Sequence, residues 1–583
     1  MFYKAGPGKM SQSVLQNNYL HLYVILAAFS LMVFRYYWLI QWRPDEMWYC
    51  MQVDSPYFEK SAYFRFFNFY AAKLIGYFLG GLNSFEKCMA VSLMYSLGII
   101  SCAYYIILKL SGKTSAILGA ILVGTYSTMI YQATWFGSDR ACLFFGLLAI
   151  ALAVCDNKDN WIRFCLSGFF LLGAIYSKRP ALCFILPILI VLFYHRTWKV
   201  YLYLTLGMAA CLLFIAVCDY IWLGDFFWHI NINNYTDFMS WFSGRVDQAR
   251  VKSSHGVSWS KTYFEELLNY EFIHILFCAV ASMVLLALDM GKGLNRKNSI
   301  AFAIILVGIS SVVLHEAFHA WQTKLGIYPR YMLTMDIPLL IAFTIMLPID
   351  KFDFWEGSKR QIHRYADLLL ILFFVFLFFY TRHYNYGLLK HHWGVFNSLL
   401  HVFSFWALLT ATGGLLFCGV WMGQKLKVSQ LNLAKYVGLF CLMVISGYSI
   451  IWGNNYSHKH VQTGKKRIEA KYTNFIKSYN GRFEKIMMYE LPKKRNKYIR
   501  DVRMIFNYLY LTGKLKKEEY TDNSHIQERH LKDILSPQFE YLMTKHKEKQ
   551  INELVAEYGI GLEKIWNFRK VFLYRKLSED VSP

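Results

Sequence analysis

Two adjacent carboxylates, Asp45 and Glu46, have the clearest catalytic potential in the sequence. They directly follow a long apolar run, and Trp48 and Tyr49 come just after them. A charged side chain at a membrane boundary is costly unless it is solvated or used. A carboxylate at such a position can act as a general base that takes the proton from an acceptor hydroxyl. It can equally cap a short helix in water, so both interpretations stay open.

The segment Tyr57-Phe58-Glu59-Lys60 offers a second pair of charges in the same polar stretch. Glu59 can bind a metal ion, and Lys60 can pair with a phosphate. The alternative is an ordinary ion pair at a membrane interface, which contributes little.

Basic residues also stand at the ends of later apolar runs, in Gly137-Ser138-Asp139-Arg140, in Lys178-Arg179-Pro180 and in Arg330-Tyr331. Arg and Lys side chains there can hold a phosphate. They can also extend from a helix end toward water, and a tyrosine there can belong to an aromatic belt. The position at helix ends is compatible with either role.

The residues His315, Glu316 and His319 match the pattern H-E-x-x-H. On a helix the two histidines share a face and can hold zinc, with the glutamate as general base, which is the arrangement of a metalloprotease. A third zinc ligand is not evident in the sequence. Two interfacial histidines beside Trp321 are the alternative.

The elements that must position these residues are membrane helices. The chain has 583 residues, of which 56% are hydrophobic and only 17% charged, and lipid rather than a soluble core can accommodate such a composition. Apolar runs of spanning character lie at 19–42, 88–110, 116–134, 141–156, 163–177, 181–195, 201–223, 271–290, 299–318, 331–349, 366–381, 399–421 and 437–453. The sequence therefore predicts an α-helical polytopic membrane protein with about 13 transmembrane helices.

Basic residues orient these spans, because short cytoplasmic loops retain Lys and Arg. Alternate loops carry them, for example Lys113, Arg163, Lys199 and Arg296. This pattern predicts a cytoplasmic N-terminus and two long outer loops, 43–87 and 224–270. The stretch from Phe58 to Leu79 has the pattern of an amphipathic helix in the interface. The formal charge of +24 indicates either an anionic partner or simply these retained loop charges.

Residues 455–583 form a separate, basic and water-facing segment. The run Lys485 to Leu491 is typical of a strand, whereas Ile499 to Leu511 and Ile551 to Phe568 have helical patterns. We expect a small C-terminal α/β domain outside the membrane, following a membrane domain of residues 1–454.

These motifs together resemble the GT-C superfamily of polyprenyl-phosphate-sugar glycosyltransferases, in particular the branch with protein O-mannosyltransferases and the aminoarabinose transferase of lipid A. The family's Asp-Glu pair and following Tyr match Asp45, Glu46 and Tyr49. The later Tyr-Phe-Glu-Lys stretch of the aminoarabinose enzyme matches residues 57–60. Further matches are Asp139, Lys178 with Pro180, and Pro329 with Tyr331 before Pro338-Leu339.

The resemblance implies a bacterial inner-membrane enzyme that moves a sugar, with inversion, from a polyprenyl-phosphate donor to a cell-envelope acceptor on the outer face. Asp45 would be the general base beside Glu46. The residues and the resemblance together predict three groups of site residues. Lys60, Arg140, Lys178, Arg179 and Arg330 are candidates for the donor phosphate, and Tyr49, Asp139 and Tyr331 for the substrate. The resemblance implies a divalent metal such as zinc, magnesium or manganese at Glu59, Tyr331 and a loop histidine, His229 or His255.

The partners are then the donor, the acceptor and the bilayer, with no nucleic acid. Two alternatives remain from the sequence. One is an intramembrane zinc metalloprotease using His315, Glu316 and His319, and the other is a lipid or polysaccharide transporter.

Overall fold

The computed structural model describes part of the chain. The described residues are 10–36, 53, 66–82, 84–131, 133, 136–154, 160–195, 197–229, 231, 273–290, 295–322, 329–347, 486–489, 540–544, 556, 559, 561–568 and 571–577. Three predicted spans, at 366–381, 399–421 and 437–453, and the predicted helix Ile499 to Leu511 lie outside these residues.

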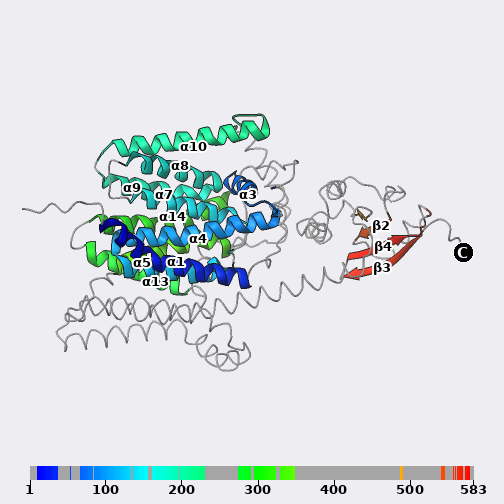
Figure 1. The fold of residues 1–583 in the computed structure, drawn as a ribbon, viewed down its shortest axis with the longest axis horizontal. Coiled ribbons are helices and arrows are strands. Elements are labelled where there is room, and N and C mark those ends of the chain that lie inside the picture. The colour runs from blue at the N-terminus through cyan, green and yellow to red at the C-terminus, as the bar shows by residue number, and fades with distance from the viewer. Residues whose placement is uncertain are drawn as a thin grey trace, which may run out of the picture. The chain divides into compact units, whose positions relative to one another are not determined.

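Helices form almost all of the described part before residue 350 (Figure 1). They are α1 (Met10–Tyr36), α3 (Phe66–Phe78), α4 (Ser84–Ser111), α5 (Lys113–Thr125), α6 (Ser127–Tyr131), α7 (Ser138–Ala153), α8 (Trp161–Ser177), the 3-10 helix η2 (Arg179–Phe184), α9 (Ile185–Phe193), α10 (Lys199–Leu223), α13 (Ile273–Met290), α14 (Arg296–Gln322) and α15 (Pro329–Met346).

The described residues belong to two compact units. The first, which we call the helical unit, takes its residues from Met1–Trp38, Tyr63–Asn68 and Ser92–Lys459. The second takes its residues from Leu39–Ala62, Phe69–Val91 and His460–Pro583. Within the described residues, three helices are long and apolar enough to cross a membrane, judged by length and composition: Glu86–Ser111, Lys199–Ile221 and Arg296–Leu314. Shorter apolar helices of 10–17 residues accompany them.

Local chemistry sets where several helices end. Gly112, with φ of 96°, separates α4 from α5, and Gly224, with φ of 72°, ends α10 in the left-handed conformation that glycine adopts at low cost. The side chain of Asn160 caps α8 by accepting from the backbone N–H of Arg163 at 3.3 Å. Tyr126, with ψ of 124°, interrupts the span predicted at 116–134, which is therefore wrong as one continuous helix.

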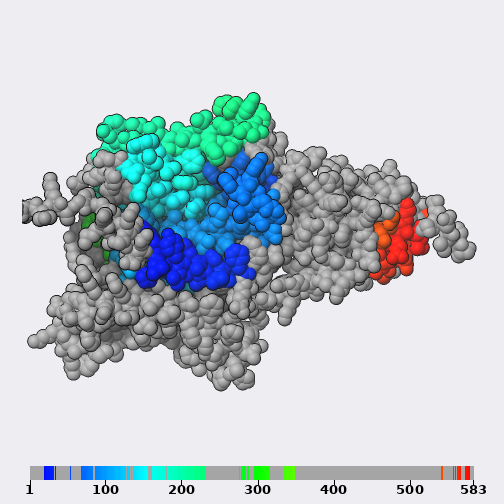
Figure 2. Space-filling view, viewed as in Figure 1, coloured from blue at the N-terminus to red at the C-terminus, as the bar shows by residue number. Residues whose placement is uncertain are grey.

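The helical unit has a buried centre and an exposed edge. Helix α15 packs on α5, α7, α13 and α14, and its residues from Met332 to Met346 are all buried. Helix α10 packs on α8 and lies at an edge of the helical unit in Figure 2. Its other side exposes Leu206, Leu213 and Ile221, as expected for a helix that faces lipid.

Four strands of the second unit pair in one sheet with the order β1-β2-β4-β3. They are β1 (Ile486–Tyr489), β2 (Tyr541–Thr544), β3 (Leu562–Phe568) and β4 (Val571–Lys576). Strand β1 runs parallel to β2, with Ile486 opposite Tyr541, and the other two pairings are antiparallel.

The sheet confirms one sequence prediction and corrects another. Strand β1 lies within the predicted run Lys485 to Leu491. The helix predicted over Ile551 to Phe568 is wrong from Leu562 onward, because this part forms β3 and pairs with β4 in a hairpin. Gly559, with φ of 65°, and Gly561 precede the strand, and glycine is unfavourable inside a helix.

Candidate active site

An ion pair between Asp139 and Lys178 joins the start of α7 to the end of α8. Asp139 lies in the first turn of α7, and Lys178 is the residue that caps α8. A carboxylate at a helix N-terminus and an ammonium at a helix C-terminus each complement the helix dipole. The Asp139 side chain is 7% exposed and the Lys178 side chain 20%, so the pair is largely shielded from water. Two residues that the sequence marked separately are thus brought together.

Arg140 adds a second positive charge beside this pair. It is 2% exposed and interacts electrostatically with Asp139. These three side chains carry two positive charges and one negative charge between them, in a region of low dielectric where charges interact strongly. Such a group of residues is suited to attracting an anion such as a phosphate. The neighbouring Arg179 begins η2, but its side chain is outside the described part of the structure.

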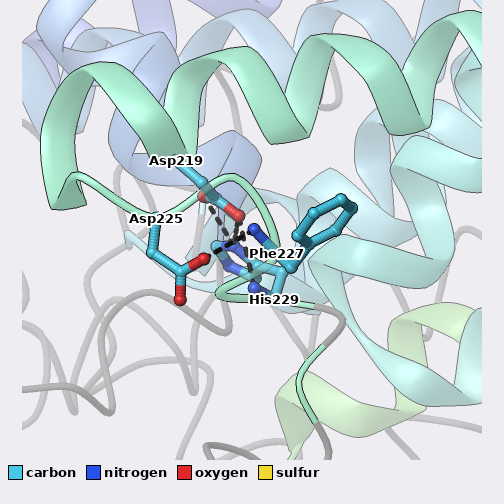
Figure 3. A network of polar contacts seen from close by, with 4 residues as sticks. All are labelled: Asp219, Asp225, Phe227 and His229. Atoms are coloured by element: carbon cyan, nitrogen blue, oxygen red, sulfur yellow. Dashed lines mark hydrogen bonds and ion pairs between the residues drawn. The ribbon is translucent and has the colours of Figure 1, made fainter.

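A second buried acid–base pair, Asp219 with His229, closes the turn that follows α10 (Figure 3). Nδ1 of His229 lies 2.7 and 2.8 Å from the two carboxylate oxygens of Asp219, and the backbone N–H of His229 donates to Asp219 Oδ2 at 3.2 Å. Within the turn, the backbone N–H of Phe227 donates to Asp225 Oδ1 at 2.9 Å. These bonds tie the beginning of the predicted second outer loop to the end of α10.

The ring of His229 also contacts Tyr176 of α8, with ring centroids 6.1 Å apart. Tyr176 lies two residues before Lys178, so the Asp219–His229 pair and the Asp139–Lys178 pair lie at the same end of α8. Sequence reasoning missed Asp219. The available signal was its place near the end of an otherwise apolar run, where an ionisable residue is costly.

A third buried carboxylate, Asp336, accepts a hydrogen bond from Tyr126. Asp336 is fully buried in α15, and Tyr126 stands at the break between α5 and α6. Nearby, Ser311 Oγ of α14 donates to Thr334 Oγ1 of α15 at 3.1 Å. The sequence did not single out Asp336, although it is an acidic residue inside a predicted span.

These contacts show which helix ends lie together. Helix α5 runs antiparallel to α15, because Ser115 Oγ donates to Leu347 O at 3.1 Å while Tyr126 reaches Asp336. The start of α15 and the end of α5 therefore lie at one end of the bundle, and the short connection from α5 places the start of α7 there too. We call this the Asp139 end.

The remaining predicted site residues fall into two groups. Arg330 and Tyr331 lie in the first turn of α15, at the Asp139 end. His315, Glu316 and His319 lie in the last turns of α14. The structure describes the backbone of these five residues but not their side chains. Asp45, Glu46, Tyr49, Glu59, Lys60 and His255 lie entirely outside the described residues. Their roles stay predictions.

No metal cluster is evident where the structure can be described: no group of three or more His, Cys, Asp or Glu residues there could hold an ion. His229 is buried against Tyr176 and Trp228 and is held by Asp219, which gives it a structural role at the start of the loop. The choice between His229 and His255 as a metal ligand stays a prediction.

Comparison of the whole chain with known proteins gives likenesses to solved structures. No family model and no curated protein sequence matches the chain. Among solved structures, ArnT from Cupriavidus metallidurans, bound to undecaprenyl phosphate, superposes with a TM-score of 0.52 over 99% of this chain and 100% of that one, at 14% identity. The chain shares the fold of this ArnT structure. At this identity the likeness establishes the fold and leaves the reaction open.

Two further solved structures are less similar. The Archaeoglobus fulgidus oligosaccharyltransferase in its apo form has a TM-score of 0.36, over 61% of this chain and 54% of that one, at 11% identity. The same organism's AglB, in complex with an inhibitory peptide and a dolichol-phosphate, has a TM-score of 0.37, over 62% and 54%, at 12% identity. Likenesses of this size carry no inference about the chain.

The Asp219–His229 pair allows a direct test of its structural role. We expect His229→Ala to lower the free energy of unfolding by about 2–3 kcal/mol, because the buried Asp219 carboxylate loses the ring that donates to it. Thermal unfolding of the purified protein in detergent measures the change. Phe227→Ala is the matched control, since Phe227 lies in the same turn with 65% of its surface exposed. Equal effects of the two substitutions would contradict the role.

Proposed function

We propose that this protein is a membrane glycosyltransferase that moves a sugar from a polyprenyl-phosphate carrier to a cell-envelope acceptor on the extracytoplasmic face of a bacterial inner membrane. The observation that carries the proposal is the GT-C fold extending over 99% of the chain and all of ArnT, a structure that holds undecaprenyl phosphate. The grouping of Arg140, Lys178 and Asp139 at one end of the bundle supports it, because a phosphate donor requires cations there.

The reaction breaks the bond between the sugar's anomeric carbon and the phosphate oxygen. The acceptor hydroxyl attacks that carbon from the opposite face, which inverts its configuration. Asp45 takes the hydroxyl proton as the new glycosidic bond forms. The polyprenyl phosphate leaves with the bonding electron pair, so its negative charge grows as the transition state is reached.

Preorganised cations stabilise this growing charge. Lys178 is held in place by Asp139, so its ammonium is already oriented before the donor binds, and Arg140 adds positive charge nearby. Lys60, Arg179 and Arg330 are further candidates from the sequence, the last two at helix starts. Tyr49 and Tyr331 would contact the substrate.

A divalent metal near Glu59, Tyr331 and His255 is part of the proposal but carries no step in it. When bound, such an ion would polarise the phosphate oxygens. The topology proposed with this function has thirteen spans, a cytoplasmic N-terminus and a C-terminal α/β domain outside.

Replacement of the proposed base tests the function directly. We expect Asp45→Asn to lower sugar transfer at least about a hundredfold, because an amide cannot accept the hydroxyl proton. The assay measures transfer of labelled sugar from polyprenyl phosphate to envelope material in membranes that contain equal amounts of each variant. Asp54→Asn is the matched control, as a second carboxylate of the same predicted loop.

The same assay distinguishes the role of Asp45 from the glycosyltransferase function as a whole. Transfer at the wild-type rate by Asp45→Asn would show that Asp45 is not the base. The absence of any new glycosidic bond with the wild-type protein, across polyprenyl-phosphate donors, would contradict the glycosyltransferase function itself.

A further inference from the structure

A group of cations and phenols lies at the end of the helical unit opposite the Asp139 end. It consists of Tyr19 and Tyr23 from α1, Tyr105 and Lys109 from α4, and Arg163 from α8, and we call it the tyrosine–cation cluster. Arg163 Nη1 donates a hydrogen bond to Tyr105 Oη at 3.3 Å. Tyr19 interacts electrostatically with the other four residues. Three helices far apart in the sequence therefore bring these side chains together.

The position of the cluster follows from the direction of its helices. Lys109 lies in the last turn of α4 and Arg163 in the first turn of α8, whereas Lys178 and the Asp139 pair lie at the other end of α8. The cluster is thus separated from the proposed catalytic site by the length of a membrane helix. A phosphate bound here is not the donor phosphate of the proposed reaction.

The side chains of the cluster are open to their surroundings. Lys109 is exposed, 65% of Tyr23 is exposed, and Tyr19, Tyr105 and Arg163 are partly exposed. At the start of α8, Trp161 is 53% exposed. Tryptophan and tyrosine are enriched where the headgroups of a bilayer meet its hydrocarbon, so the residues at this end suit a membrane interface, where lipid phosphates are found.

An exposed apolar stripe leads away from the cluster along α1. Its members are Leu20, Val24, Leu31 and Phe34, with 58%, 42%, 64% and 50% of their surfaces exposed. Their spacing of four, seven and three residues places them on one face of the helix. A cationic end joined to an apolar stripe matches the shape and chemistry of a phospholipid, with a charged headgroup and an acyl chain.

We propose that the tyrosine–cation cluster binds the phosphate of an anionic phospholipid whose acyl chain lies along the exposed face of α1. The planar guanidinium of Arg163 and the ammonium of Lys109 attract the phosphate, and the phenol hydroxyls donate hydrogen bonds to its oxygens. The apolar stripe distinguishes a lipid from a free phosphate ion. The alternative is that these basic residues only set the orientation of the chain in the membrane. That role requires no particular arrangement of their side chains.

The test measures lipid binding to the purified full-length protein by native mass spectrometry. Phosphatidylglycerol and phosphatidylcholine with identical acyl chains are titrated separately, and inorganic phosphate is added as a competitor. We expect preferential binding of phosphatidylglycerol that inorganic phosphate does not displace. We expect Lys109→Gln with Arg163→Gln to weaken this binding roughly thirtyfold, since each basic residue near an anionic surface contributes about fivefold.

The matched control removes the same charge elsewhere at this end of the bundle. Lys199→Gln with Lys297→Gln changes the first turns of α10 and α14, outside the cluster. We expect it to alter affinity by less than about twofold, because salt screens charges that do not touch the bound phosphate. Tyr105→Phe removes only the hydroxyl that accepts from Arg163 and is expected to weaken binding about fivefold. This variant keeps both charges. It therefore still tests lipid binding at the cluster if the double variant does not fold.

Each of four results would overturn the proposal. The first is equal affinity for the two lipids, and the second is displacement by inorganic phosphate at comparable concentration. The third is wild-type binding by both the double variant and Tyr105→Phe. The fourth is an equal loss in the control, which would indicate unspecific attraction to the net charge of this end.

Discussion

Replacing Lys178 with methionine is expected to lower both the stability of the protein and its sugar transfer. The substitution leaves the carboxylate of Asp139, only 7% exposed, without the cation that pairs with it. Removing one partner of a shielded ion pair is strongly destabilising, and we expect a loss of about 2–4 kcal/mol because Lys178 keeps some exposure. Thermal unfolding in detergent measures stability. Transfer is expected to fall at least about a hundredfold, because the leaving phosphate loses a preorganised cation.

A double variant distinguishes the two roles of Lys178. In Asp139→Asn with Lys178→Met neither residue is charged, so we expect stability above that of Lys178→Met alone. We expect it to stay below the wild type, because the buried Arg140 loses the carboxylate with which it interacts. Transfer is expected to stay low, because the positive charge is still missing. Recovery of transfer together with stability would show that Lys178 only supports the structure. Lys199→Met, at an exposed position at the start of α10, is the control for loss of a lysine.

Replacing Gly207 with alanine is expected to separate α10 from α8. A Cβ at Gly207 would overlap the carbonyl oxygen of Cys165, and a Cβ at Gly168 would overlap that of Leu204. The two backbones therefore touch at a reciprocal contact in which only glycine fits, the arrangement that small residues permit between membrane helices. Both atoms that would collide belong to the backbone, so relief requires movement of a whole helix. We expect a loss of at least about 2 kcal/mol for either substitution.

The same contact connects packing to the site. Helix α10 carries Asp219, and its displacement from α8 would also disturb the contact of His229 with Tyr176. Thermal unfolding of Gly207→Ala and Gly168→Ala measures the effect, and Gly80→Ala is the matched control because a Cβ there meets nothing within 4 Å. Unchanged unfolding of the Gly207 and Gly168 variants would contradict the close approach.

The helices before residue 350 were predictable because apolar runs of spanning length have few alternatives in lipid. The predicted runs 88–110, 201–223 and 331–349 correspond to α4, α10 and α15 within a few residues. The interruptions were harder to predict. The break at Tyr126 lies inside a continuous apolar run, and its side chain bonds to Asp336, some two hundred residues later. Pairing at such a distance leaves no local pattern in the sequence.

The candidate site, too, was predictable from the sequence only in part. Asp139 and Lys178 were identifiable separately, as charges at the ends of apolar runs, but their ion pair depends on how α7 packs on α8. Asp219 was missed because its partner His229 follows in a turn whose conformation is set by Gly224. The local pattern of β3 predicts a helix, but its pairing with β4 outweighs that pattern and makes it a strand.

The sequence by itself determined that this is an α-helical membrane protein, since a chain with so many apolar residues and so few charges favours lipid, and its motifs indicated the GT-C fold. Only the tertiary structure decided which polar side chains meet: Asp139 with Lys178, Asp219 with His229, and Arg163 with Tyr105. The physical reason is that hydropathy is a property of each segment, whereas an ion pair in a region of low dielectric requires two segments to be placed within a few ångströms.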